Sequence, residues 1–89
     1  MGKRLIRVNE LLKREISQIL HTRYQSEAVT ITITAVDVAP DLRNARVYYS
    51  VIGDALARRE GGRFLIKIRK ALRHEVSKHV VLKYSPGIG

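Results

Sequence analysis

An 89-residue chain with 45 % apolar residues has room for one folded domain, expected over residues 1–89, and is too apolar for a disordered tail. It has no cysteine, which excludes disulfide frameworks, thiolate metal sites and thiol chemistry and suits the reducing cytoplasm. The 17 Lys and Arg against 8 Asp and Glu leave a formal net charge of +9, so a polyanion is the expected partner, nucleic acid first and an anionic membrane surface second.

The first predicted element is an amphipathic helix over residues 5–21. At about 100° per residue, its apolar side chains recur along one stripe, with Leu20 on the flank and Leu11 at an edge that widens the buried face. Arg7 and Arg14 fall on the opposite side of this helix. The stripe consists of Leu5, Val8, Leu12, Ile16 and Ile19.

Two alternating patterns follow and predict an antiparallel hairpin. Residues 29–35 place apolar side chains at every second position between threonines, which is the period of a half-buried strand. The phase shifts by one residue after Ala35, and a bulge there would absorb the shift. Residues 40–44 supply turn chemistry and residues 45–51 alternate again, so the two strands pair around a short turn.

The second half of the chain predicts a helix over residues 63–79 and a short strand over residues 80–84. Residues 55–62 have no clear assignment, and Gly61-Gly62 is interpreted as a turn. A strand–helix–strand crossover is right-handed, which makes the second and third strands parallel. The expected fold class is therefore α+β: an α-β-β-α-β domain with a three-stranded mixed sheet and both helices on one face.

The second helix carries the main candidate binding residues. Its basic side chains fall within a sector of about 80° opposite the apolar stripe, and its one acid, Glu75, falls on the core side. Arg69 and Arg73 lie beside the stripe on one flank. A solvated face is the simpler alternative, but such faces usually mix both signs, whereas clustered cations along one helix indicate phosphate binding. The cations of this sector are Arg63, Lys67, Lys70, His74 and Lys78; Arg73 is added to them as a candidate.

A second basic cluster lies at the N-terminus. Glu10 and Glu15 are interleaved with it at helical spacing, so local ion pairs explain it about as well as RNA binding does. The cluster comprises Lys3, Arg4, Arg7, Lys13 and Arg14, of which Lys3, Arg4, Arg7 and Arg14 are secondary RNA-binding candidates.

No catalytic or metal-binding constellation accompanies these cations. His74 and His79 are five residues apart and do not share a helix face, and His21 belongs to another element, so we expect no metal and no cofactor. Asp37 and Asp41 bracket a turn, where capping explains them better than acid–base chemistry does. The sequence therefore predicts no enzyme and no small-molecule substrate.

The aromatic residues favour recognition of backbone and shape. Phe64 fits the core stripe, and Tyr49 and Tyr84 share the parity of apolar strand residues. Tyr48 is the one strand aromatic on the alternate face. Proteins that bind single strands by stacking usually offer several such rings, so contact with the phosphate backbone is the better expectation. One core accounts for all apolar positions, which predicts a monomer.

Three segments resemble the ribosome-binding factor A family in the order in which they occur. They are residues 7–16 (RVNELLKREI), residues 36–51 (VDVAPDLRNARVYYSV), and the closing stretch formed by residues 72–76 (LRHEV) and 82–86 (LKYSP). The most specific part is Asp41 followed by Ala45-Arg46-Val47-Tyr48. The resemblance covers essentially the whole chain.

This resemblance implies a K-homology-like fold of the second type without a GxxG loop, and no GxxG occurs in the chain. It also implies a non-enzymatic factor that binds the free small ribosomal subunit and its ribosomal RNA and assists late maturation. Family members commonly place a small residue and a Gly in the second helix just before the position of Leu72, which kinks the helix. Residues 68–70 here are Ile-Arg-Lys, which leaves open whether this helix bends or runs straight.

Two other classes of protein would also suit the charge. A general nucleoid-type binder of double-stranded DNA is the first alternative, and a preference for structured RNA would exclude it because the two duplexes differ in groove shape and in the 2′-hydroxyl. A peripheral membrane protein is the second. The apolar stripe of the basic helix is needed against the sheet, which argues against a membrane partner.

Overall fold

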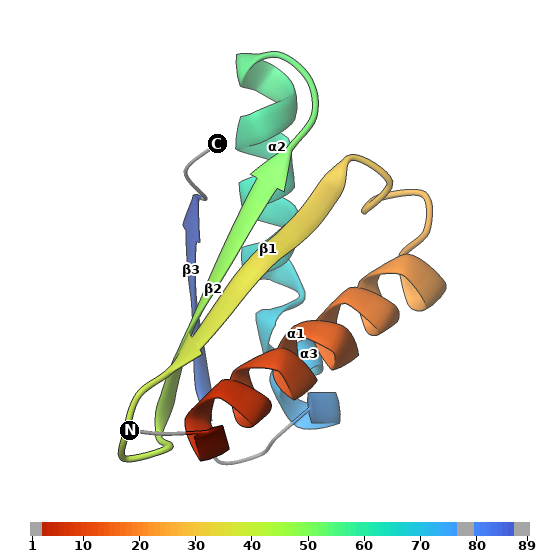
Figure 1. The fold of residues 1–89 in the computed structure, drawn as a ribbon. Coiled ribbons are helices and arrows are strands. Elements are labelled where there is room, and N and C mark those ends of the chain that lie inside the picture. Colours follow the sequence, from red (N-terminus) through yellow and green to blue (C-terminus); the bar gives the residue numbers. More distant parts are fainter. Residues whose placement is uncertain (1–2, 77–79, 87–89) are drawn as a thin grey trace.

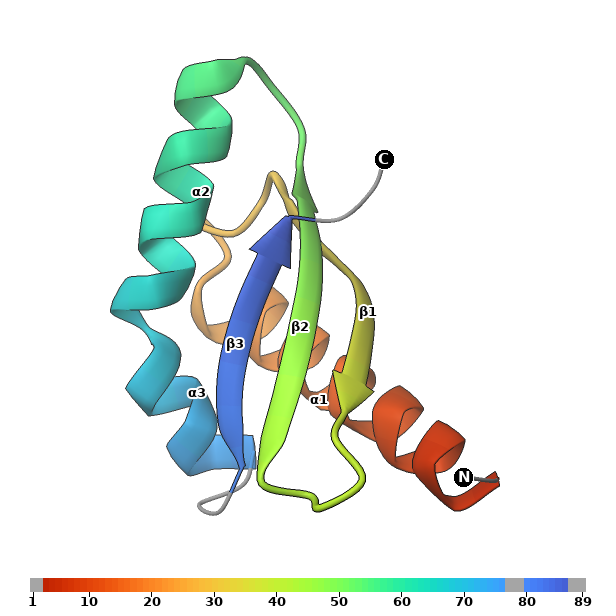
Figure 2. The same cartoon turned by 90° about the vertical axis from the view of Figure 1, so that its left-hand side faces the viewer.

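The computed structural model describes residues 3–76 and 80–86 and has an α+β fold (Figure 1). The elements follow the order α1 (Lys3–Arg23), β1 (Ile31–Val38), β2 (Asn44–Val51), α2 (Ala55–Lys67), α3 (Arg69–Val76) and β3 (Val81–Pro86). The sheet order is β1-β2-β3, with β1 and β2 antiparallel and β2 and β3 parallel. Figure 2 shows the helices behind the sheet, on one side only. The predicted mixed sheet with helices on one face is confirmed.

Helix α1 packs on the sheet through side chains four residues apart. Leu12, Ile16 and Leu20 are buried, while Ile19 is only half-buried, so the buried stripe is rotated from the predicted one toward Leu20. Leu11 does not widen the buried face as expected, because 53 % of it is exposed. The side chains of residues 3–5 lie outside the description, so the prediction for Leu5 stays untested.

The hairpin follows its sequence pattern closely. The register shifts between Ile33 and Ala35, so the predicted bulge is confirmed. Buried side chains alternate on each side of it, Ile31 and Ile33 before and Val36 after. Residue 29, however, is not part of the strand, and its Val side chain is 73 % exposed.

Helix α2 begins eight residues earlier than the predicted second helix. Asp54 caps it, because its Oδ1 accepts a hydrogen bond of 2.8 Å from the Ala57 amide. Gly61 and Gly62 lie inside α2, so their interpretation as a turn is wrong. A Cβ at Gly61 would stand 2.8 Å from a methyl group of Val51 on β2. The close approach of helix and strand therefore requires the glycine that made the segment look like a turn.

The predicted single helix is two helices. Ile68 separates α2 from α3 with φ −94° and ψ 5°, although no Gly or Pro occurs between residues 63 and 76. The Ile68 amide still donates to the Phe64 carbonyl, and the Leu72 amide donates to the Ile68 carbonyl, at 3.1 and 2.9 Å. The backbone thus bends without losing these bonds, and Ile68 and Leu72 both stay buried. The predicted extension of this helix to residue 79 falls partly outside the described residues.

Polar contacts near both ends of α1 tie it to the rest of the domain. Near its start, Asn9 Oδ1 accepts a hydrogen bond of 2.8 Å from the Val38 amide at the end of β1. At its end, Arg23 Nη1 forms an ion pair of 2.6 Å with Glu75 Oε1 of α3. Glu75 is exposed, so its predicted place on the core side is wrong. The pair joins the two helical segments across the surface.

Candidate nucleic-acid interface

Three cations and one histidine line the solvent side of α2 and α3. Their placement follows from the buried stripe of these helices, which runs through Gly61, Leu65, Ile68 and Leu72. Each of these four residues stands two positions after a member of that stripe, which is about 200° around the helix. The relation holds on both sides of the bend at Ile68. These exposed residues are Arg63, Lys67, Lys70 and His74, called here the helix row.

One exposed acid, Glu60 of α2, lies one turn before Arg63, but it forms no ion pair with the helix row. In the described part of the chain, none of its members forms an ion pair with Asp or Glu. The one acid of α3, Glu75, is paired with Arg23 instead. A row of such cations at helical spacing suits a run of phosphates, which are the dominant source of nucleic-acid affinity.

The two flanking arginines differ from the helix row. Arg73 is half-buried, so its charge is less accessible than predicted for a binding residue. Arg69 is exposed and acts on Tyr84 of β3, where burial raises the pKa of the phenol to about 12 and the Arg69 charge partly opposes that rise. Lys78, the last predicted member of this face, lies outside the described residues.

The N-terminal cluster lies in another part of the molecule. Arg7 and Arg14 are exposed on α1, as predicted, and Lys13 is half-buried. Figure 2 shows the start of α1 beyond β1, whereas α2 and α3 lie beside β3 at the other edge of the sheet. The structure therefore does not merge the start of this cluster with the helix row. Lys3 and Arg4 open α1, but their side chains lie outside the description.

Two polar residues considered above for metal binding or acid–base catalysis make structural hydrogen bonds. His21 Nε2 lies 3.0 Å from the Ile31 carbonyl oxygen, to which it donates. Asp41 Oδ1 accepts a hydrogen bond of 2.9 Å from the Arg43 amide, which confirms the capping interpretation for this residue. Within residues 3–76 and 80–86, no group of three His, Cys, Asp or Glu is placed to hold a metal ion. No helix in the same ranges has both the length and the apolar character needed to span a membrane.

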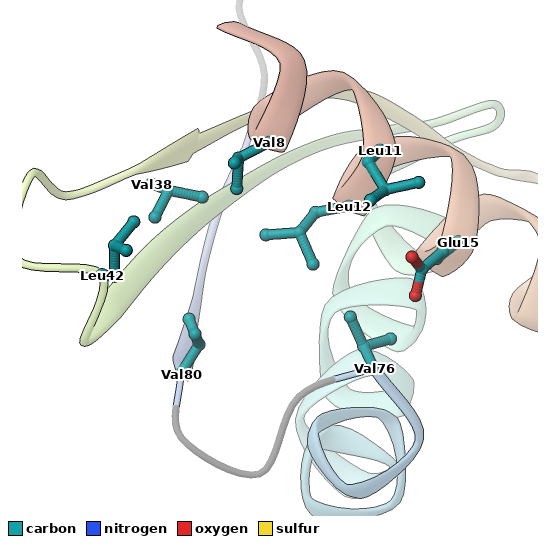
Figure 3. Close-up of a pocket in the computed structure, with 8 residues that line it drawn as sticks. All are labelled: Val8, Leu11, Leu12, Glu15, Val38, Leu42, Val76 and Val80. Carbon is teal, nitrogen blue, oxygen red and sulfur yellow. The ribbon is translucent and has the colours of Figure 1, made fainter. Parts of the chain in front are cut away.

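Sequence reasoning missed an apolar hollow of about 360 Å³ beside α1 (Figure 3). Leu11 of α1 and Leu42 of the β1–β2 turn border it, with Val76 and Val80 on the far side. Leu42 has φ 61°, a left-handed backbone conformation that a branched side chain rarely adopts. Its apolar side chain in an otherwise polar turn was the signal that could have pointed to this hollow.

The fold, the net charge of +9 and the helix row define a small basic α+β domain of the kind that binds nucleic acid. The family model described as ribosome-binding factor A matches residues 4–89. A ribosome-binding factor A from Opitutus terrae is 54 % identical over 86 residues, which cover 97 % of this chain and 70 % of that protein. The chain belongs to the ribosome-binding factor A family, so the resemblance inferred from the sequence is confirmed.

More distant relatives agree with this assignment. A ribosome-binding factor A from Desulfitobacterium hafniense is 37 % identical over 83 residues, covering 92 % of this chain and 66 % of that protein. The chain thus spans about two thirds of the length of these relatives. The crystal structure of ribosome-binding factor A from Thermus thermophilus superimposes with a TM-score of 0.81 at 16 % identity, covering 97 % of both chains. At that identity, the likeness supports the fold.

Proposed function

We propose that this chain binds the free small ribosomal subunit through its ribosomal RNA and assists late maturation of that RNA without catalysing a reaction. Membership of the ribosome-binding factor A family supports a ribosome-associated role. The observation that carries the RNA contact is the helix row, three exposed cations and one exposed histidine that form no ion pair with an acid among the described residues.

The helix row suits contact with the RNA backbone. Lys and Arg side chains are long and flexible, and each neutralised phosphate releases condensed counterions. A strand or duplex that lies along α2 and α3 would meet the row over both helices. Such contacts fix position and orientation but carry little sequence information, so the specificity for one RNA site must come from shape.

Co-sedimentation tests the proposal. The chain is mixed with free small subunits, with assembled ribosomes and with linear double-stranded DNA at equal concentration. We expect the chain to pellet with free subunits, less with assembled ribosomes, and to be displaced poorly by DNA. Equal retention on DNA would favour the nucleoid-type alternative and contradict the proposal.

Salt dependence measures the electrostatic part of the same interaction. If about five phosphates are neutralised, the slope of log K against log salt is about −3.5 with the single-strand coefficient. The measurement is a binding titration on free subunits at several salt concentrations. A slope near zero would contradict a role for the helix row.

A further inference from the structure

The face of the sheet away from the helices carries a polar surface that the helix row does not use. Figure 2 looks onto this face, with no helix in front of the strands. Its side chains alternate with buried ones such as Val47 and Leu82. The members that matter are Asp37, Arg46, Tyr48, Lys83 and Ser85, called here the open sheet face.

Two cations stand side by side on the open sheet face. Arg46 of β2 and Lys83 of β3 are register partners, and both are exposed. Neighbouring strands are about 4.8 Å apart, so the two charged ends can reach one phosphate or two consecutive phosphates. Neither forms an ion pair with an acid among the described residues. Asp37 of β1 is the register partner of Arg46 on its other side and partly offsets the positive charge.

An aromatic ring lies next to these cations. Tyr48 is two residues after Arg46 on the same strand, so its side chain is on the same face, and its register partner on β3 is Ser85. On its other side, the bulge in β1 places Ala35 opposite it. Ala35 is exposed and has the smallest side chain in that strand, so the β1 side of the ring is not covered by a bulky neighbour. This face offers one half-exposed ring beside two cations, so phosphate contacts would supply most of the affinity for a single strand and the ring would add stacking with one base.

We propose that the open sheet face binds a single-stranded segment of RNA, with phosphates at Arg46 and Lys83 and a base on the ring of Tyr48. The identity of the polymer as RNA rests on the proposed function. The surface itself is separate from the helix row and lies on the opposite side of the sheet. The domain then contacts two RNA segments, one on each side.

A protein partner fits this face less well. Stable protein interfaces have a core depleted of charged residues. Here a row of three charged side chains crosses all three strands of the sheet, from Asp37 through Arg46 to Lys83. A strand of phosphates matches the two cations, whereas an apolar surface would bury them without a countercharge of its own.

The test is binding of a fluorescent 12-nucleotide oligouridylate, measured by anisotropy at fixed salt, beside a 12-base-pair RNA duplex. The double variant Arg46→Gln with Lys83→Gln should weaken oligouridylate binding by about tenfold or more. Its control is Arg58→Gln with Arg59→Gln, which removes the same charge from the first turns of α2 and should change binding by less than about threefold. Tyr48→Ala should lose about tenfold, while Tyr48→Phe keeps the ring and should retain most of the affinity.

A loss of affinity can come from a variant that fails to fold, so the test includes one variant that is expected to gain affinity. Asp37→Asn removes the negative end of the row and should strengthen binding by about threefold, since a unit charge at contact distance in water is worth about that much. Glu27→Gln makes the same change in net charge in the exposed loop after α1 and should leave binding unchanged. A gain in Asp37→Asn alone supports a local effect of the open sheet face.

Three results would overturn the inference. They are the absence of oligouridylate binding by the unmodified chain, retention of full affinity by the Arg46 and Lys83 double variant, or a loss confined to the duplex. Each is independent of the proposed function, whose failure shows as absence of the unmodified chain from the small-subunit pellet. The two ideas can therefore fail separately.

Discussion

Helix α1 and the pair α2–α3 cover the same sheet and carry similar numbers of cations, yet they present them differently. On α1 the exposed cations Arg7 and Arg14 share the helix with Glu10 and Glu15. On α2–α3 Glu75 is held by Arg23, and Glu60 is exposed one turn before Arg63 without forming an ion pair with it. The acids of α1 stand between its exposed cations, whereas those of α2–α3 stand before and after the helix row, so the position of the acids along a surface says more than the number of cations.

The largest expected difference between these helices is in stability. Leu72→Ala should lower the free energy of unfolding by about 2–5 kcal/mol, because Leu72 is only 1 % exposed and its loss leaves a cavity. Leu11→Ala on α1 should change it by about 0.5 kcal/mol or less, because that side chain is half exposed. Urea titration followed by circular dichroism gives both values. Equal losses would mean that the hollow beside Leu11 is filled in solution.

Charge reversal separates the two helices in binding. Lys67→Glu with Lys70→Glu should weaken binding to free small subunits on the order of a hundredfold, since two phosphate contacts become repulsive. Arg7→Glu with Arg14→Glu makes the same change of charge on α1 and should cost less than about tenfold. Sedimentation with free subunits measures both. If the α1 variant proves the weaker binder, the main RNA surface lies on α1 and the helix row is misassigned.

The glycines of α2 have no counterpart in α1 and make a third comparison. Gly61→Ala should destabilise the domain by about 1–3 kcal/mol, because the new methyl group would meet Val51 across the close helix–strand contact. Gly62→Ala is the matched variant and should cost less, since its nearest neighbour is the Tyr49 hydroxyl at 3.0 Å, the end of a longer side chain. Thermal melts monitored by circular dichroism compare the two. A stabilised Gly61→Ala would show that α2 can move away from β2.

The smallest expected effect is a loss of folding stability at alkaline pH, and it involves Tyr84 of β3. Burial raises the pKa of Tyr84 from 10.0 to about 12, so the folded state holds the phenol proton more tightly than the unfolded state does. The resulting stabilisation is complete below pH 10 and is lost as the pH rises from 10 toward 12. Tyr84→Phe should remove this part of the pH dependence, which urea titrations at about pH 9 and about pH 11 would reveal. An unchanged dependence would show that the phenol is solvated in the folded state.

The sequence predicted the sheet better than it predicted the second helical region. Strand alternation and the phase slip at Ala35 depend on neighbouring residues, so the pattern located the bulge correctly. Gly61-Gly62 was wrongly interpreted as a turn. Gly61 is needed because Val51 of β2 approaches it closely, and the local sequence pattern does not contain this contact. Asp54 is a local signal for the start of α2, because its side chain is of the type that caps a helix N-terminus. The bend at Ile68 could not be predicted from the sequence, because no Gly or Pro occurs near it.

For the two proposed binding surfaces as well, the sequence predicted what depends on neighbouring residues and missed what depends on contacts between distant segments. Helical spacing alone predicted that Arg63, Lys67, Lys70 and His74 face away from the core, and all four are exposed. The neighbours of Arg46 could not be predicted from spacing. Its pairing with Lys83 depends on the parallel register of β2 and β3, which joins segments far apart in the chain.

The pairing of β2 with β3 also constrains the order of events during synthesis. β3 is the last element of the sheet along the chain, and its Val81 amide donates to the Arg43 carbonyl to begin the parallel ladder. Until residue 86 has been translated, α2 and α3 have only α1 and the β1–β2 hairpin to pack against, and the core that holds Leu65 and Leu72 lacks the buried Leu82. A nascent chain therefore completes this sheet and the core beneath α2 and α3 only when β3 has been translated.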